Sequence, residues 1–367
     1  MLSEQVSIRG DTARRESPRR VLLMLLRIAI GAGLLAYLAK SGLIDVRALS
    51  KLFTSWRITL AALTLLIVDS ALMSVRLSWL FRPQGLNLRF GTSLKLALVG
   101  FFFGTFLPGA AGGDLSKLFY TTRGNGGRRI EIMTVVLLDR AIGLFSLLLL
   151  PLIFAPMFTQ TLRSEFALRS LLLTLGLLAL GAAAGFLLCL FSDPFISCLP
   201  SGARNRLTKN RVIRQVRGAI AKYRENLSIL CAALGLSFLA NLSLVFVTML
   251  GAATLERFSW TPRMFLVIPI GHIVNSLPLT PGGLGVGETA FSALFNLLGI
   301  RGGAEALLCT RIWMAIIGLI GFVFYLHGVS REVFGEPNMA DGPSSAVSGT
   351  MKNEHRNSCR STDGYGA

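Results

Sequence analysis

Two adjacent charged residues, Asp139 and Arg140, lie in the middle of the apolar run TVVLLDRAIGLFSLLLL (residues 134–150). An ionised side chain at the centre of a membrane helix costs roughly 2.5–3.5 kcal/mol on insertion scales, so such residues usually serve a function. Adjacent residues on a helix do not face each other, so we expect each charge to find its own partner on another helix or in a ligand. Asp69 is a candidate partner for Arg140, and Arg27 for Asp139.

A further carboxylate, Glu288, follows a glycine-rich break in LPLTPGGLGVGETAF (277–291), and a similar break occurs in LPGAAGGD (107–114). Both stretches contain L-P-x-x-x-G-G, and proline and glycine in this density interrupt helices. Non-helical backbone at membrane depth is tolerated only where protein or a water-filled cavity surrounds it. The two breaks therefore predict an internal cavity, in which freed N–H groups attract anions. The glycines expected to approach a ligand are Gly112, Gly113, Gly282 and Gly283.

The charged residues beside the breaks have two interpretations each. We expect Asp114 to cap the helix that follows the first break, and Lys117 either to meet a lipid phosphate or to extend into the membrane interface. Glu288 either complements the dipole of the following helix or binds a cation or a proton inside the membrane.

Other polar residues lie near the second break. His272 and Asn275 precede it and are expected to line the cavity, although a satisfied buried hydrogen bond is the commoner role. Arg311, in the last apolar run, is predicted to extend outward to the interface.

The composition indicates a multi-pass membrane protein with an all-α fold. Of the 367 residues, 52% are hydrophobic and only 15% are charged, whereas soluble domains carry about a quarter charged residues. The mean hydropathy is +0.61. Apolar runs of about 18 residues or more predict spanning helices, and shorter ones beside the breaks predict two re-entrant hairpins. The predicted spans are 21–39, 58–75, 131–156, 170–191, 228–249 and 304–326, and the hairpin segments are 92–107, 264–277 and 288–300.

The net charge of +18 predicts the orientation. Arginines before residue 21 and a basic loop at 204–224 are expected to be cytoplasmic by the positive-inside rule. With these anchors the two hairpins enter from opposite faces, an inverted pair typical of secondary transporters. We therefore expect an inner (plasma) membrane protein with both termini cytoplasmic, composed of a basic tail (1–20), a membrane domain (21–328) and a disordered tail (329–367).

The sequence lacks motifs for cofactors and metals. It has no H-E-x-x-H and no Walker lysine loop, and GGLGVG (282–287) lacks the spacing and strand context of a dinucleotide fingerprint. We therefore predict no cofactor, no metal and no nucleic-acid partner.

Three stretches, LPGAAGGDLSKL, VVLLDRAIGL and LPLTPGGLGVGETAF, resemble the membrane domain of the lysylphosphatidylglycerol synthase family over roughly residues 18–330. The resemblance implies a lipid flippase domain, and the soluble aminoacyl-transferase domain of the full synthases is not expected here. The sequence departs from the family pattern at Gly287 and Lys117, where arginine is common.

Together these observations predict a non-enzymatic protein that moves or binds an anionic lipid, either a phospholipid or a polyprenyl-phosphate-linked sugar. Arg140, Lys117 and the break amides would bind the phosphate, and Asp139, Glu288 and Asp69 would balance charge or couple to protons. Two alternatives stay open. One is an integral membrane transferase acting on lipid-linked substrates, and the other is a non-transporting partner of a lipid-modifying synthase or glycosyltransferase.

Overall fold

The computed structural model describes residues 55–106, 112–123, 126–191, 211–254, 261–277, 285–300 and 302–327, and these contain helices and no β-strand. All of them belong to one compact unit. The predicted span 21–39 with Arg27, the two tails, and the centres of both breaks, including Gly282 and Gly283, lie outside the described residues.

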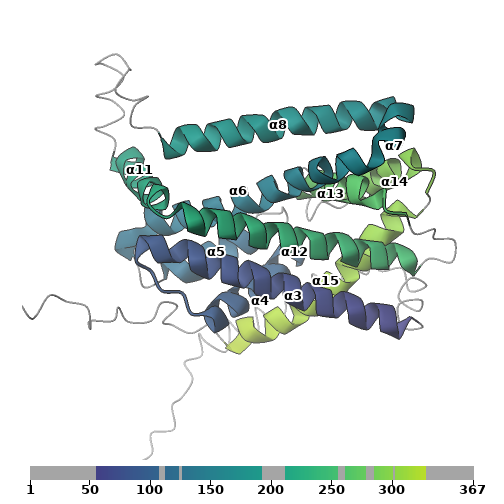
Figure 1. Ribbon diagram of the computed structural model, residues 1–367. Helices are drawn as coiled ribbons and strands as arrows, with labels where there is room; N and C mark the ends of the chain where they lie inside the picture. The colour runs from purple at the N-terminus through teal and green to yellow at the C-terminus, as the bar shows by residue number, and fades with distance from the viewer. Residues whose placement is uncertain are drawn as a thin grey trace, which may run out of the picture. The chain divides into compact units, whose positions relative to one another are not determined.

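Five long helices among the described residues are apolar enough to cross a membrane (Figure 1). Each coincides with a predicted span, which confirms the all-α, multi-pass fold. Shorter helices flank the two glycine breaks and connect the long ones. The long helices are α3 (Trp56–Phe81), α6 (Arg129–Phe154), α8 (Phe166–Leu190), α12 (Leu227–Ala253) and α15 (Gly303–His327). The shorter ones are α4 (Phe90–Phe106), α5 (Gly112–Thr122), α7 (Thr159–Ser164), α11 (Arg211–Arg224), α13 (Met264–Ser276) and α14 (Val286–Leu297), with 3-10 turns η1 (Arg82–Gln84), η2 (Gly126–Arg128) and η3 (Ala155–Phe158).

The helix order repeats in the two halves of the chain. A long helix, two short ones and a second long helix follow one another in α3–α4–α5–α6 and again in α12–α13–α14–α15. The first helices of the two halves are antiparallel, because Arg76 Nη1 donates to Ser237 Oγ at 2.7 Å and Ser243 Oγ donates to the Leu65 carbonyl at 3.0 Å. The two halves therefore run in opposite directions, as the inverted pair requires.

The base of the α4–α5 hairpin lies at the end of the bundle where α11 is found. Gln84, just after α3, accepts a hydrogen bond from Arg128 at the start of α6, and its side chain donates to the Ala219 carbonyl of α11 at 2.8 Å. Tyr223 of α11 donates to the Leu80 carbonyl at 2.6 Å. Since α4 follows α3 and α5 precedes α6, both outer ends of this hairpin are at the α11 end.

The predicted basic loop at 204–224 is helical from Arg211, and in this respect the prediction is wrong. Val216, Ala219 and Tyr223 recur at helical spacing and place one apolar face against the bundle, where Ala219 and Tyr223 are buried. Burial raises the pKa of the Tyr223 phenol, so it stays a neutral donor. Exposed Arg214 and Arg224 lie on the outer side.

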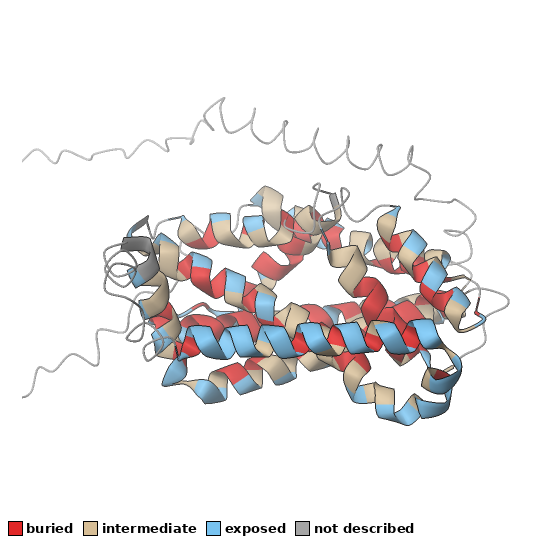
Figure 2. Ribbon diagram, turned by 90° about the horizontal axis from the view of Figure 1, so that it is seen from above, coloured by how far each residue is buried: buried red, intermediate tan, exposed pale blue. Residues whose placement is uncertain are grey.

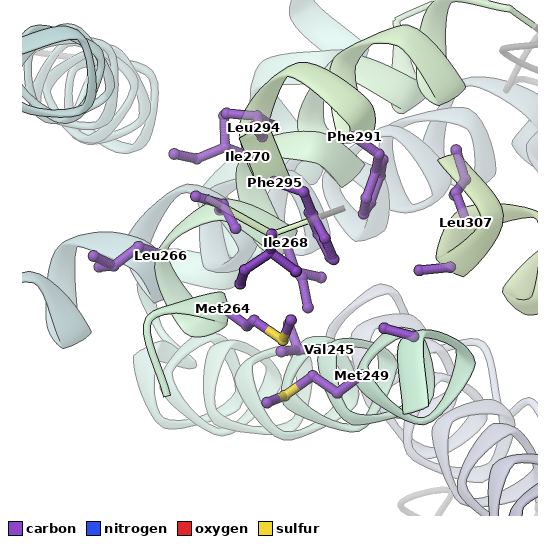
Figure 3. Packing of buried hydrophobic residues seen from close by; sticks show 14 of the residues in the cluster. Val245, Met249, Met264, Leu266, Ile268, Ile270, Phe291, Leu294, Phe295 and Leu307 are labelled. Carbon is purple, nitrogen blue, oxygen red and sulfur yellow. The ribbon is translucent and has the colours of Figure 1, made fainter. Parts of the chain in front are cut away.

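The α13–α14 hairpin is anchored at the opposite end of the bundle. Its residues Met264, Ile268 and Phe295 pack in one apolar cluster with Met249 near the end of α12 and Leu307 near the start of α15 (Figure 3). The α4–α5 hairpin therefore begins and ends at the α11 end of the bundle, and the α13–α14 hairpin begins and ends at the opposite end. Their re-entry into a membrane stays a prediction. Buried residues gather where the helices face one another, and exposed residues lie on their outer sides (Figure 2).

Close helix contact at Gly321 gives a first testable prediction. A Cβ on Gly321 of α15 would overlap the Leu98 carbonyl of α4, and small residues allow such close approach in membranes. We expect Gly321→Val to destabilise the protein by about 1–3 kcal/mol or more, measured as a lower melting temperature of the purified protein. Gly181→Val on α8, where no atom lies within 4 Å of an added Cβ, is the matched control. Equal melting temperatures of the two variants would contradict the packing.

Candidate functional site

A fully buried ion pair joins the two long helices of the first half. Arg76 Nε on α3 lies 2.7 Å from Asp139 Oδ1 on α6, and Asp139 is 1% exposed. Arg76 also donates to Ser237, and Gly143 leaves room for its guanidinium, with only 3.2 Å between Arg76 Nη1 and an added Cβ. Each charge is thus desolvated but has a partner with good geometry, as burial of ions requires.

Lys117 of α5 extends this pair toward the first hairpin. Its Nζ lies 3.4 Å from Asp139 Oδ2 and 3.9 Å from Asp114 Oδ1. The side chain is 12% exposed and points into the bundle, so the interpretation of Lys117 as extending into the membrane interface is wrong. Lys117 therefore connects the buried pair to the beginning of α5.

Arg140 forms the outermost pair of this cluster, with Asp114. The two side chains are 30% and 24% exposed, so this pair is far more accessible than Arg76 and Asp139. The predicted pairing of Arg140 with Asp69 is wrong, because the break brings the beginning of α5 against α6. Asp139 pairs with Arg76, while its predicted partner Arg27 lies outside the described residues.

The beginning of α5 differs in two details from the prediction. Asp114 is the third residue of the helix rather than its cap, and it bonds to side chains on α5 and α6. Gly113 faces α4, where an added Cβ would lie 2.8 Å from the Gly100 carbonyl, and Gly112 is buried. Glycine is therefore required at position 113 because α4 packs closely on α5.

Asp69 is a further buried carboxylate on α3. It lies seven residues before Arg76 and hence on the same helical face. Its carboxylate is within electrostatic reach of Arg76 and Lys117, yet its Oδ1 has no hydrogen-bond partner. The first cluster thus holds three cations, Arg76, Lys117 and Arg140, together with three carboxylates.

A second polar cluster lies beside the second break. Arg311 Nε on α15 is 3.2 Å from Glu288 Oε1 on α14, and Arg311 Nη2 donates to Asn275 Oδ1 on α13 at 2.8 Å. The prediction that Arg311 extends outward is therefore wrong. Glu288 also accepts a 2.7 Å hydrogen bond from the Gly285 N–H, which agrees with its interpretation as a group that complements the helix N-terminus. Gly285 has φ +80°, a conformation that glycine adopts without strain.

Gly287 and His272 complete this second cluster. A Cβ on Gly287 would lie 2.9 Å from Arg311 Nη2, so the guanidinium occupies the space that a side chain at 287 would need. His272 is buried, 2.9 Å from Thr248 Oγ1, and its ring meets Phe291 edge-on at 5.1 Å. His272 therefore has the satisfied buried contact that was the commoner expectation, and Asn275 binds Arg311.

The sequence-based candidates omit Arg76 and place Arg311 in the wrong direction. The second span was predicted to end at Val75, whereas α3 continues to Phe81 and places Arg76 inside the bundle. The residues Leu77, Trp79, Leu80 and Phe81 continue the apolar run past Val75, and this is the signal that the helix extends. Arg311 was assigned outward because its partners, Asn275 and Glu288, come from distant positions in the chain. Among the described residues, no three His, Cys, Asp or Glu side chains are grouped closely enough to hold a metal ion.

Comparison with known families gives one match, and it covers most of the chain. The family described as the lysylphosphatidylglycerol synthase TM region matches residues 24–325, which include every described helix except the last two residues of α15. No curated protein and no solved structure matches the chain.

Proposed function

Because the chain belongs to the lysylphosphatidylglycerol synthase transmembrane family, whose members are membrane proteins related to lipid handling, we propose that it moves an anionic lipid between the two leaflets of its membrane. The lipid is a phospholipid or a polyprenyl-phosphate-linked sugar, and it crosses without chemical change. Its acyl or prenyl chains stay in the bilayer while the phosphate passes through the protein.

The observation that carries this proposal is the graded exposure of the first cluster. Arg76 and Asp139 are sealed inside, whereas Arg140 and Asp114 are each about a quarter to a third exposed. Arginine and lysine both donate charge-assisted hydrogen bonds to phosphate oxygens. An arriving phosphate therefore replaces Asp114 as the partner of Arg140 and Lys117, and the buried pair keeps these cations in place.

The carboxylates have a second role in this proposal. When a phosphate replaces Asp114, the released carboxylate and the buried Asp69 and Asp139 keep the charge of the cluster balanced, if necessary by taking up a proton. Asp69 suits this role because its Oδ1 has no hydrogen-bond partner among the described residues. Glu288 serves the same purpose at the second break. The amides around Gly112, Gly113, Gly282 and Gly283 would add donors for the head group.

We further propose an inner-membrane location with the α11 end in the cytoplasm. Lysine and arginine are enriched in cytoplasmic segments, and exposed arginines gather at the α11 end more than at the opposite end of the described bundle. Those at the α11 end are Arg82, Arg89, Arg123, Arg129, Arg214 and Arg224, and those at the opposite end are Arg57, Arg163, Arg169 and Arg263.

Cysteine labelling in intact cells tests the orientation. In a cysteine-free background, Arg263→Cys before α13 is expected to react with an impermeant maleimide, because it lies at the outer end. Ala221→Cys on α11 is exposed as well but is expected to react only after the cells are opened. Labelling of Ala221→Cys in intact cells, with protection of Arg263→Cys, would contradict the orientation and the direction of both hairpins.

Lipid movement itself is tested in liposomes. The purified protein is reconstituted with trace fluorescent phosphatidylglycerol, or with a fluorescent polyprenyl phosphate, and the outer leaflet is bleached with an impermeant reductant. We expect bleaching beyond the outer-leaflet half only in vesicles that contain the protein. Bleaching that stops at the outer leaflet for every anionic lipid would contradict the proposed function and favour a non-transporting role.

A further inference from the structure

The second polar cluster repeats the accessible part of the first. Asp114 is the third residue of α5, and Glu288 is the third residue of α14. Each pairs with an arginine from the long helix that follows, Arg140 of α6 or Arg311 of α15. We propose that Arg311, with Glu288 and Asn275, forms a second binding site for the phosphate of a lipid, reached from the end opposite α11. This inference rests on the proposed function and adds a second position to the path.

The equivalence of the two sites extends to the neighbouring residues. The segments LLDR (137–140) and LCTR (308–311) place Thr310 where the first half has Asp139. Asp139 bonds to Arg76 of α3, and Thr310 Oγ1 correspondingly lies 3.4 Å from Thr248 Oγ1 of α12. Since α3 and α12 are the first long helices of their halves, both pairs join the same two positions of the repeat.

The inner parts of the two clusters differ in charge. In the first half the inner position holds a buried ion pair, which Lys117, three residues after Asp114, also contacts. In the second half the inner position holds two threonine hydroxyls, and Phe291 stands three residues after Glu288. The four-helix arrangement of each half thus forms with or without a buried ion pair at the inner position. The arginine and carboxylate beside the break are the charged elements that both halves retain.

The positions of Arg140 and Arg311 along their helices suit the transfer of a lipid phosphate from one site to the other. Arg140 lies about 16 Å along α6 from its start at the α11 end, and Arg311 lies about 12 Å along α15 from its start at the opposite end. Helices of 25 and 26 residues are about 38 Å long. The two arginines are therefore on either side of the middle of the bundle, each nearer to a different end.

The second site is expected to hold a phosphate less tightly than the first. A phosphate at the first site meets Arg140 and Lys117, whereas one at the second meets Arg311 and the amide of Asn275. That amide now accepts from Arg311 through its oxygen, and its nitrogen is the donor a phosphate would use. Weaker binding at the outer position allows the lipid to leave.

Neutral variants in the liposome assay with fluorescent phosphatidylglycerol separate a binding role of Arg311 from a structural one. We expect Arg311→Gln to slow phosphatidylglycerol movement at least about tenfold, because one charge-assisted contact to phosphate is lost. The double variant Arg311→Gln with Glu288→Gln removes both charges and keeps the size and hydrogen bonding of the pair. It is also expected to stay slow, although its melting temperature should match that of the wild type. Arg263→Gln, an exposed arginine at the same end, is the matched control and is expected to be as fast as the wild type.

The outcomes are distinguishable. If the wild type moves phosphatidylglycerol and the double variant moves it equally fast, Arg311 and Glu288 are only a structural pair, and the second site is refuted while the proposed function stands. If the wild type moves no anionic lipid, the proposed function fails first. A photoactivatable phosphatidylglycerol gives an independent readout. It should label α14 or α15 in the wild type and in Arg140→Gln, but not in Arg311→Gln, and equal labelling of all three would also overturn the proposal.

Discussion

Arg76→Ala is expected to lower the free energy of unfolding by about 3–5 kcal/mol, because it leaves Asp139 charged, buried and without its closest partner. Asp139→Ala is expected to lower the free energy of unfolding by a similar amount, because it leaves Arg76 without its carboxylate partner. The measurement is denaturant unfolding of the purified protein in mixed micelles, followed by tryptophan fluorescence. A large part of the chain's marginal stability would then depend on a single buried contact.

The control for this prediction keeps the shape of the pair and removes its charge. Arg76→Gln with Asp139→Asn retains hydrogen bonding between α3 and α6, and a neutral pair escapes most of the desolvation cost. Thr248 and Thr310 in the second half show that a neutral pair suits this position. We therefore expect the double variant to recover most of the stability lost in Arg76→Ala. A double variant as unstable as Arg76→Ala would mean that the ion pair is not the reason for the loss.

Arg140→Ala is expected to abolish lipid movement while leaving a folded, membrane-inserted protein. Its partner Asp114 is 24% exposed and keeps Lys117 Nζ at 3.9 Å, so the substitution leaves no buried charge without a partner. The phosphate, in contrast, loses the one accessible arginine of the first cluster. The measurements are phosphatidylglycerol movement in liposomes and the melting temperature of the same preparation. Arg129→Ala, an exposed arginine at the start of α6, is the matched control.

A second-site variant distinguishes a functional from a structural Arg140. If Arg140 serves only to neutralise Asp114, then Arg140→Ala with Asp114→Ala should restore movement at the wild-type rate. We expect the double variant to remain inactive, because the cation that meets the phosphate is still missing. Full recovery would show that the site has been assigned to the wrong residues.

The sequence predicts the helices well because their signal is local. Apolar runs such as 228–249 and 304–326 correspond to α12 and α15 within a few residues, and the short run 264–277 corresponds to α13. The L-P-x-x-x-G-G repeat marks where each hairpin turns. The helical nature of α11 is missed because its basic residues serve only as a signal for orientation in the sequence, although Ala219 and Tyr223 have helical spacing.

The partners within the site are a tertiary property and could not be read from local patterns. The charges of Asp139 and Arg140 were recognised, as was their need for different partners, since neighbours on a helix point apart. Which residues meet them depends on how far α5 returns from the break and on where α3 ends. The sequence predicts that Asp114 begins one helix and that Arg76 follows the end of another, where backbone N–H groups or solvent satisfy a charged side chain. Only the packing of α3, α5 and α6 shows that they complete the cluster.

The most direct test of the central claim compares two lipids in the same vesicles. The rates of movement of fluorescent phosphatidylglycerol and fluorescent phosphatidylcholine are measured for the wild type and for Arg140→Gln, which keeps hydrogen bonding but removes the positive charge. We predict that the wild type moves phosphatidylglycerol at least about tenfold faster than phosphatidylcholine, since the anionic head group lacks the choline cation that would oppose Arg140 and Lys117. In Arg140→Gln this preference should disappear. A wild type that moves both lipids at the same rate, or an Arg140→Gln variant that keeps the preference, would contradict an anion-selective path at Arg140.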